Sequence, residues 1–152
     1  PPSATQSNPI DTLHCLNCDL PSIKIQPDFL QSLITLNVTS SHLTSESLVS
    51  LFNSTTTNIR VLTLTSNRIS SIPKEIFQRL PKLISLNLSY NPISTLPDDL
   101  FSSNPIIANN LRTLSLECCK LTSPARAGCT LAQVLVPHAA ARPYPLMRTP
   151  SG

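Results

Sequence analysis

A 24-residue repeat is the feature that most limits what this chain can fold into. Leu62, Leu64, Asn67 and Ile69 return 24 positions later as Leu86, Leu88, Asn91 and Ile93. The match continues beyond this segment, because Ile72-Pro73 returns as Leu96-Pro97 and Phe77 returns as Phe101. A fixed period of this length indicates stacked supersecondary units, in which each unit contacts only its neighbours.

Three weaker copies extend the repeat to five. The pattern is Leu-x-x-Leu-x-Leu-x-x-Asn-x-Leu, and its copies start near residues 10, 33, 59, 83 and 111. At least about three units are needed to bury a continuous core, so five are enough for a domain. We therefore predict a repeat domain at 10–136, an irregular segment at 1–9, and a disordered or non-repeat tail at 137–152. We interpret the chain as a fragment of a larger protein or as a partial gene product.

The pattern gives each of its positions a place in the fold. In the Leu-x-Leu core, the alternation of a short strand sends both Leu inward and the residue between them to the other face. The ninth position also points inward, where a side chain can bond backbone groups that would otherwise be buried unpaired. We call this position the slot, and we expect the turns without Asn there to be less firmly held. The slot residues are Cys18, Ser41, Asn67, Asn91 and Cys119.

These motifs resemble the leucine-rich repeat superfamily. The resemblance implies an α/β solenoid arc of about five units, with short parallel strands on the concave face and short helical or irregular convex legs. The middle repeats resemble the typical class of extracellular receptors and matrix proteins. In the second repeat, Thr44 or Ser45 precedes apolar residues at helical spacing, which predicts a helix. The second and fifth repeats have some ribonuclease-inhibitor-like character, which implies a helical leg at residues 131–135.

Five cysteines raise the question of a metal or redox site. Cys15 and Cys18 have the spacing of zinc and redox motifs, but both stand at inward positions, and the Cys118-Cys119 pair is about 100 residues away. We therefore interpret Cys15 and Cys18 as buried thiols, with a disulfide or a metal site as alternatives. The odd number of cysteines favours no ordered disulfide framework. The sequence predicts neither a metal nor a cofactor.

Charge and composition weigh against several classes of function. The formal net charge is +3, but residues 1–119 carry seven Lys or Arg against eight Asp or Glu. There is no basic stripe with interleaved aromatic residues, which weighs against nucleic acid, and no apolar run long enough to enter a membrane. No Ser, His and Asp stand in a recognisable catalytic arrangement, so we do not expect an enzyme.

The outward strand positions form the surface that this architecture offers to a partner. The surface is neutral and rich in hydroxyl groups, although a solvated strand face chosen for β propensity would have the same composition. Tyr90 and His14 are the best single anchors, because interfaces favour aromatic side chains. The predicted partner-binding residues on the concave face are His14, Asn37, Thr63, Asn87, Tyr90, Ser115 and Glu117.

Three Asn-x-Ser/Thr sequons start at Asn37, Asn53 and Asn87. Asn53 lies in a return loop and is the best placed of the three, because a glycan at either of the others would obstruct the concave face. The sequence thus predicts a non-catalytic protein-binding module of a cell-surface or secreted receptor or adhesion protein. The alternatives are a cytosolic inhibitor-like domain, and a partial gene product with no function of its own.

Overall fold

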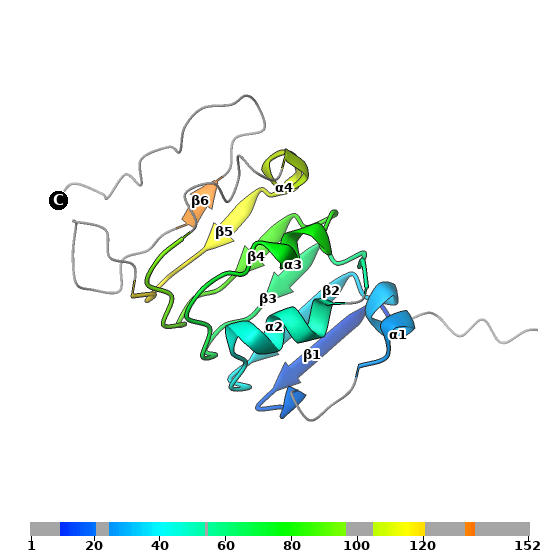
Figure 1. Cartoon of the computed structure of the whole chain (residues 1–152), viewed down its shortest axis with the longest axis horizontal. Coiled ribbons are helices and arrows are strands. Elements are labelled where there is room, and N and C mark those ends of the chain that lie inside the picture. Colours follow the sequence, from blue (N-terminus) through cyan, green and yellow to red (C-terminus); the bar gives the residue numbers. More distant parts are fainter. Residues whose placement is uncertain (1–9, 21–24, 54, 97–104, 121–132, 136–152) are drawn as a thin grey trace, which may run out of the picture.

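The chain folds as a stack of coils, each of which adds one strand to a single sheet (Figure 1). The computed structural model describes residues 10–20, 25–53, 55–96, 105–120 and 133–135. The segments predicted at 1–9 and 137–152 lie outside the described residues.

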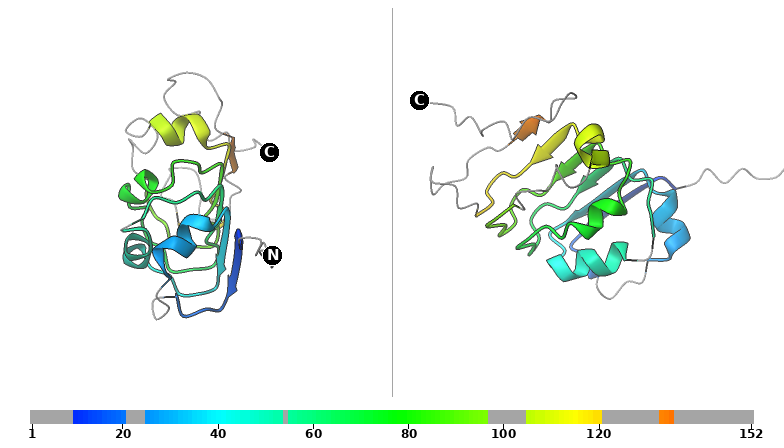
Figure 2. Two further views of the ribbon diagram at one scale, coloured as in Figure 1. Left: turned by 90° about the vertical axis from the view of Figure 1, so that its right-hand side faces the viewer. Right: turned by 45° about the horizontal axis from the view of Figure 1, so that its top comes forward.

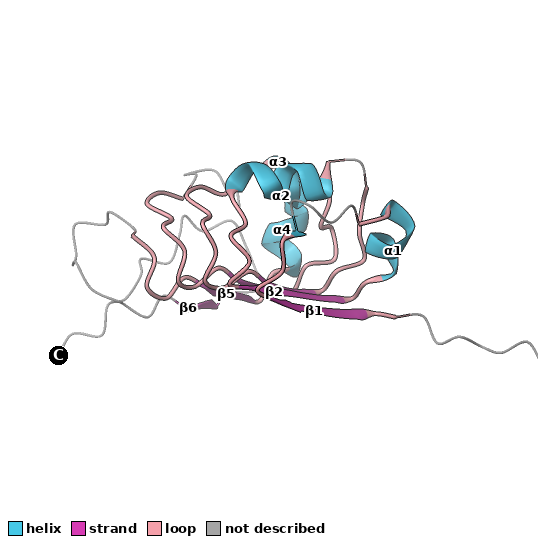
Figure 3. Ribbon diagram, turned by 90° about the horizontal axis from the view of Figure 1, so that it is seen from below, coloured by secondary structure: helices cyan, strands magenta, loops and turns pink. Residues whose placement is uncertain are grey.

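Strands and helices alternate along the described chain. The strands are β1 Thr12–Leu16, β2 Thr35–Thr39, β3 Val61–Thr63, β4 Ser85–Asn87, β5 Thr113–Ser115 and β6 Gln133–Leu135. The helices are α1 Pro27–Ser32, α2 Ser45–Phe52, α3 Glu75–Gln78 and α4 Pro105–Asn110. All four helices lie on one side of the sheet, and the other side carries no helix of the described chain (Figures 2 and 3). We call this second side the open face.

The sheet follows the order of the sequence, and β1 to β5 run parallel. The same position of the repeat pairs with itself in every copy. Leu36, Leu62, Leu86 and Leu114, for example, are register neighbours on β2 to β5. The structure confirms the predicted leucine-rich repeat solenoid with short parallel strands.

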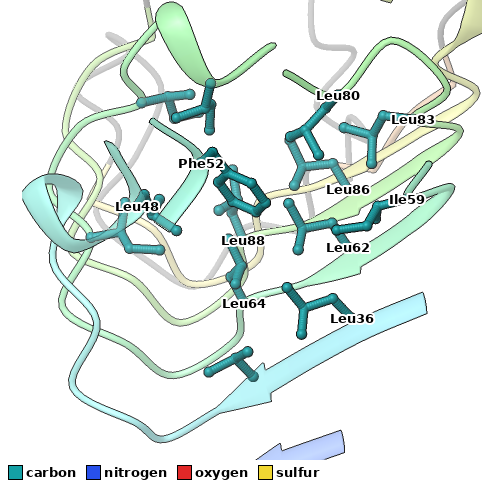
Figure 4. Close-up of a cluster of buried hydrophobic side chains, with 14 of the residues drawn as sticks. Leu36, Leu48, Phe52, Ile59, Leu62, Leu64, Leu80, Leu83, Leu86 and Leu88 are labelled. Atoms are coloured by element: carbon teal, nitrogen blue, oxygen red, sulfur yellow. The ribbon is translucent and has the colours of Figure 1, made fainter. Parts of the chain in front are cut away.

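The core lies between the sheet and the helices and is built mainly from aliphatic side chains, with Phe52 and Phe77 among them (Figure 4). Both Leu of the Leu-x-Leu core are buried in the third, fourth and fifth repeats, as the alternation predicts. In the second repeat, α2 begins after Thr44, whose Oγ1 accepts a hydrogen bond from the Ser47 N–H at 3.2 Å. Leu48 and Phe52 lie one helical turn apart on α2 and are buried, which confirms the helix predicted there.

The prediction of a helical leg at 131–135 is wrong for its last three residues. Gln133–Leu135 form β6, which pairs antiparallel to β5, with Val134 opposite Leu114. No further parallel strand follows β5 in the described chain, so the outer edge of β5 would otherwise present unpaired N–H and C=O groups. Antiparallel pairing with β6 provides hydrogen-bond partners for these groups.

Each described repeat turns sharply at the same place after its strand. The residue before the slot has a positive φ in all five copies: Asn17 54°, Ser40 53°, Ser66 56°, Tyr90 60° and Cys118 52°. None of these residues is Gly, although the left-handed conformation costs a residue with a Cβ roughly 1–2 kcal/mol of conformational free energy. The turn therefore depends on contacts that outweigh this cost.

The slot residues supply those contacts. The Asn67 Oδ1 atom accepts hydrogen bonds from the N–H groups of Ser41 and Leu43, at 2.9 and 3.2 Å. Its Nδ2 atom donates to the Val38 carbonyl at 2.8 Å and to two carbonyls of its own turn. Asn67 thus ties the turn of the preceding repeat to its own turn while it is buried.

Two other slots make the same kind of contact, Asn91 with an amide and Ser41 with a hydroxyl. Asn91 accepts from the Ile69 N–H at 3.1 Å and donates to the Leu64 carbonyl at 2.8 Å. Ser41 is shorter, and its Oγ accepts from the Cys18 N–H at 3.0 Å. Each of these side chains therefore reaches back to the repeat before it.

A second set of side chains ties the repeats together at the opposite end of the strands. Each member donates to a backbone carbonyl of the preceding repeat: Ser32 to Ile10 at 3.2 Å, Asn58 to Gln31 at 2.9 Å and Asn110 to Pro81 at 2.7 Å. The strands are therefore held in register at both ends, which fixes the spacing of the side chains on the open face.

Candidate binding face

Five of the predicted binding residues lie in one row across the open face. The row takes one residue from each of β1 to β5: His14, Asn37, Thr63, Asn87 and Ser115. Neighbouring strands of a sheet are about 4.8 Å apart, so this middle row presents one hydrogen-bonding side chain at every such step. His14 is exposed, and the other four side chains are half-buried.

The two Asn side chains of the middle row are oriented by their own strands. The Asn37 Oδ1 atom accepts from the Thr39 hydroxyl at 2.8 Å. The Asn87 Oδ1 atom accepts from the Ser89 N–H at 3.1 Å. Both contacts use the amide oxygen, so the Nδ2 donors are left for a ligand. The middle row therefore offers two fixed pairs of donors, two strands apart.

The edge of the open face at the carboxyl ends of the strands carries the remaining predicted residues. Tyr90 follows β4, its side chain is 55 % exposed, and its N–H donates to the Glu117 carbonyl at 2.7 Å. His14 lies on β1, three strands away, so a ligand that contacts both must span about 14 Å. The structure therefore gathers five predicted residues in the middle row, but it does not bring His14 and Tyr90 together.

The described chain offers little for metal or acid–base chemistry at this face. No group of three His, Cys, Asp or Glu could hold a metal ion within the ranges that the structure describes. None of the described helices is long and apolar enough to cross a bilayer. What the open face offers is hydrogen-bonding groups, the exposed ring of Tyr90 and the exposed apolar side chains of Leu16 and Val61.

The interpretation of Cys15 and Cys18 as buried thiols is wrong. The two form a disulfide, and their Cα atoms are 5.7 Å apart, within the range that a disulfide spans. The left-handed turn at Asn17 brings them together, and spacing alone could not show that turn. Cys15 is buried as predicted, whereas Cys18 is only half-buried.

The other cysteines also differ from the expected picture. Cys118 is disulfide-bonded, so the expectation of no disulfide framework does not hold. Cys129 lies outside the described residues. Cys119 is a free thiol in the slot, and its Sγ donates to the Leu88 carbonyl at 3.4 Å. Burial raises the pKa of Cys119, although hydrogen bonds from the backbone of Asn91 and Ile93 oppose the rise.

The three sequons occupy two different surfaces. Asn53 is exposed at the end of α2, on the helical side of the sheet (Figure 3). Asn37 and Asn87 stand in the middle row of the open face. A glycan on Asn53 would therefore leave the open face accessible.

The residue that precedes each strand was not among the predicted binding residues. The position is second in the repeat pattern, and its copies read Asp11, Ile34, Arg60, Ile84 and Arg112. Alignment of the five copies could have revealed this column. The predicted binding residues come from the outward strand positions and from the turns that follow them, and none comes from just before a strand.

Comparison with known proteins supports the repeat. Residues 57–121 match the family model described as leucine rich repeat. Osteomodulin of Rattus norvegicus is 42 % identical over 53 residues, which are 35 % of this chain and 12 % of that protein. Osteomodulin of Bos taurus is 37 % identical over 54 residues, 36 % of this chain and 13 % of that protein. Tsukushi of Gallus gallus is 44 % identical over 50 residues, 33 % of this chain and 14 % of that protein. The chain thus spans a small part of each relative.

The raised pKa of Cys119 predicts slow alkylation of the native protein. The thiolate is the reactive form, so at neutral pH iodoacetamide should label Cys119 more slowly in the folded chain than in the chain unfolded by urea. The native rate should keep rising with pH after the unfolded rate has levelled off. Peptide mass spectrometry at a series of pH values measures both rates. Equal rates, or a native rate that levels off first, would contradict the burial of this thiol.

Proposed function

We propose that this chain, which belongs to the leucine-rich repeat family, is a non-catalytic module that binds another protein on the open face of its sheet. The observation that carries the proposal is the middle row, in which five strands in register present hydrogen-bonding side chains at a fixed spacing. Ligand sites that are already ordered lose little conformational entropy on binding, and this favours affinity.

The composition of the open face supports a protein partner. Thr63, Ser115 and the two oriented amides can pair with polar groups of a protein surface, and Tyr90 adds an aromatic ring at the edge. Protein interfaces are enriched in such aromatic anchors, and hydrogen bonds surround them. Family likeness alone would not assign this role, because solenoids serve many functions.

We also propose that the module works outside the cytosol, as part of a cell-surface or secreted receptor or adhesion protein. The disulfide between Cys15 and Cys18 and the disulfide-bonded state of Cys118 support an oxidising compartment, because cytosolic thiols are kept reduced. Asn53, which is exposed and begins a sequon, is consistent with the same compartment. The cytosolic alternative lacks such support.

A single large charge on the open face should weaken binding strongly. Thr63→Arg places a long cationic side chain at the centre of the middle row, where it covers its neighbours. We expect an affinity loss of about 10-fold or more for any partner bound there, measured by biolayer interferometry against partners selected from an array of purified extracellular domains. Ser50→Arg, on the exposed side of α2, is the matched control and should leave the affinity unchanged. The double variant His14→Ala and Tyr90→Ala should also weaken binding.

The opposite pattern would count against the proposal. If Ser50→Arg weakens binding while Thr63→Arg and the double variant do not, the helical side is the binding surface. If the array yields no partner that responds to any of these variants, the open face is not a binding site.

The proposed compartment predicts glycan on Asn53. When the chain is secreted from mammalian cells behind a signal peptide, we expect Asn53 to carry an N-linked glycan, because it is exposed at a helix end. Digestion with peptide-N-glycosidase in heavy-oxygen water, followed by mass spectrometry, marks each occupied Asn. A secreted chain with Asn53 unmodified, or with Cys15 and Cys18 as free thiols, would contradict the assignment.

A further inference from the structure

The register of the sheet extends beyond the strands and builds a second row of side chains. The N–H of Ile34 donates to the carbonyl of Asp11 at 2.7 Å, and that of Arg60 donates to Ile34 at 2.8 Å. The N–H of Ile84 donates to Arg60, and that of Arg112 donates to Ile84, both at 2.8 Å. These five residues therefore stand side by side on successive repeats. We call them the amino-end row.

The amino-end row alternates apolar and cationic side chains. Ile34 is 40 % exposed and Ile84 is 37 % exposed, which leaves two large β-branched side chains in contact with water. Arg60 lies between them and is exposed, and Arg112 follows Ile84. From Ile34 to Arg112, the row therefore places an apolar side chain next to a cationic one at every step.

The positive charge of the row lies on its third and fifth members. Arg60 and Arg112 are two strands apart, about 10 Å between their Cα atoms. The Arg112 Nη1 atom donates to the Asn109 carbonyl at 2.7 Å, which holds this guanidinium in place. Lys82 lies on the repeat between the two arginines, and its Nζ atom donates to Asn58 Oδ1 at 2.7 Å. Asp11, the acidic residue of the row, stands at its opposite end beyond Ile34.

We propose that the amino-end row binds a protein segment in which two carboxylates flank an apolar side chain. The guanidinium groups of Arg60 and Arg112 bind the carboxylates, which must be about 10 Å apart, and the apolar side chain packs on Ile84. Arg is suited to this task because its planar fork of donors matches a carboxylate. This partner chemistry deepens the protein-binding function proposed above and rests on it.

The isoleucines distinguish this partner from a polyanion. A sulfated polysaccharide could pair with the two arginines, but it has no large apolar group to bury against Ile84, so it would gain little from that side chain. An acidic–apolar protein segment satisfies both kinds of group at once. The row therefore favours a protein segment over a polysaccharide.

Synthetic peptides provide a direct test. The probe is a fluorescein-labelled peptide with a central Glu-Leu-Leu-Glu, whose two Glu lie on the same side of the chain, about 9 Å apart, in the polyproline II conformation. The controls are the same peptide with Gln for Glu, the same peptide with Ser for Leu, and fluorescein-labelled heparin. Fluorescence anisotropy with the full chain measures each affinity. We expect the Glu-Leu-Leu-Glu peptide to bind at least about 10-fold more tightly than either control peptide, and its binding to weaken with added salt.

Variants of the protein test whether the peptide binds at the amino-end row. The double variant Arg60→Gln and Arg112→Gln should weaken peptide binding by about 10-fold or more, and Ile84→Ser should weaken it without a change in charge. Arg68→Gln removes one positive charge at the other end of the strands, where Arg68 is exposed, and should have no effect. Each variant is compared only after its melting temperature has been shown to match that of the parent chain.

Three results would overturn the proposal. The first is no measurable binding of the Glu-Leu-Leu-Glu peptide. The second is binding that the double Arg variant leaves unchanged. The third is binding of heparin at least as tight as that of the peptide, with no effect of Ile84→Ser, because charge alone would then explain it. Any of these could occur while a partner of the open face still responds to Thr63→Arg, so failure here is distinct from failure of the proposed function.

Discussion

The fold depends on one recurring contact, in which the inward slot residue of a repeat bonds the backbone turn of the repeat before it. Asn67 is the fullest case, with acceptor and donor contacts that reach Ser41, Leu43 and Val38. The turns need this support because each passes through a left-handed residue that is not Gly. Ser and Cys replace Asn in other slots, and Cys119 still reaches the preceding repeat through its sulfur.

Both candidate binding surfaces follow from the register that these contacts hold. Since equivalent positions pair across the sheet, any residue type that recurs at one position becomes a row of side chains. The middle row is neutral and rich in hydrogen-bonding groups, whereas the amino-end row combines isoleucine with arginine. A partner could therefore meet two different chemistries on one rigid scaffold, and small changes of sequence at a single repeat position would alter one row without disturbing the other.

Much of this architecture could be predicted from the sequence, because the repeat fixes which side chains point inward. The buried Leu86 and Leu88 and the helix after Thr44 follow from spacing alone. The disulfide between Cys15 and Cys18 could not be predicted in the same way, because it depends on the backbone turn at Asn17. The antiparallel pairing of β6 could not be predicted either. It provides hydrogen-bond partners for the outer edge of β5, and that edge exists only in the assembled sheet.

The most direct test of the account is the free energy of unfolding of Asn67→Ala, measured by urea titration beside Asn109→Ala. Removal of the Asn67 amide leaves buried N–H and C=O groups of two repeats without partners, so we predict a loss of about 2 kcal/mol or more. Asn109 is an exposed helical residue, and its replacement should change stability by no more than about 0.5 kcal/mol. Equal, small losses for both variants would show that the slot does not hold the repeats together.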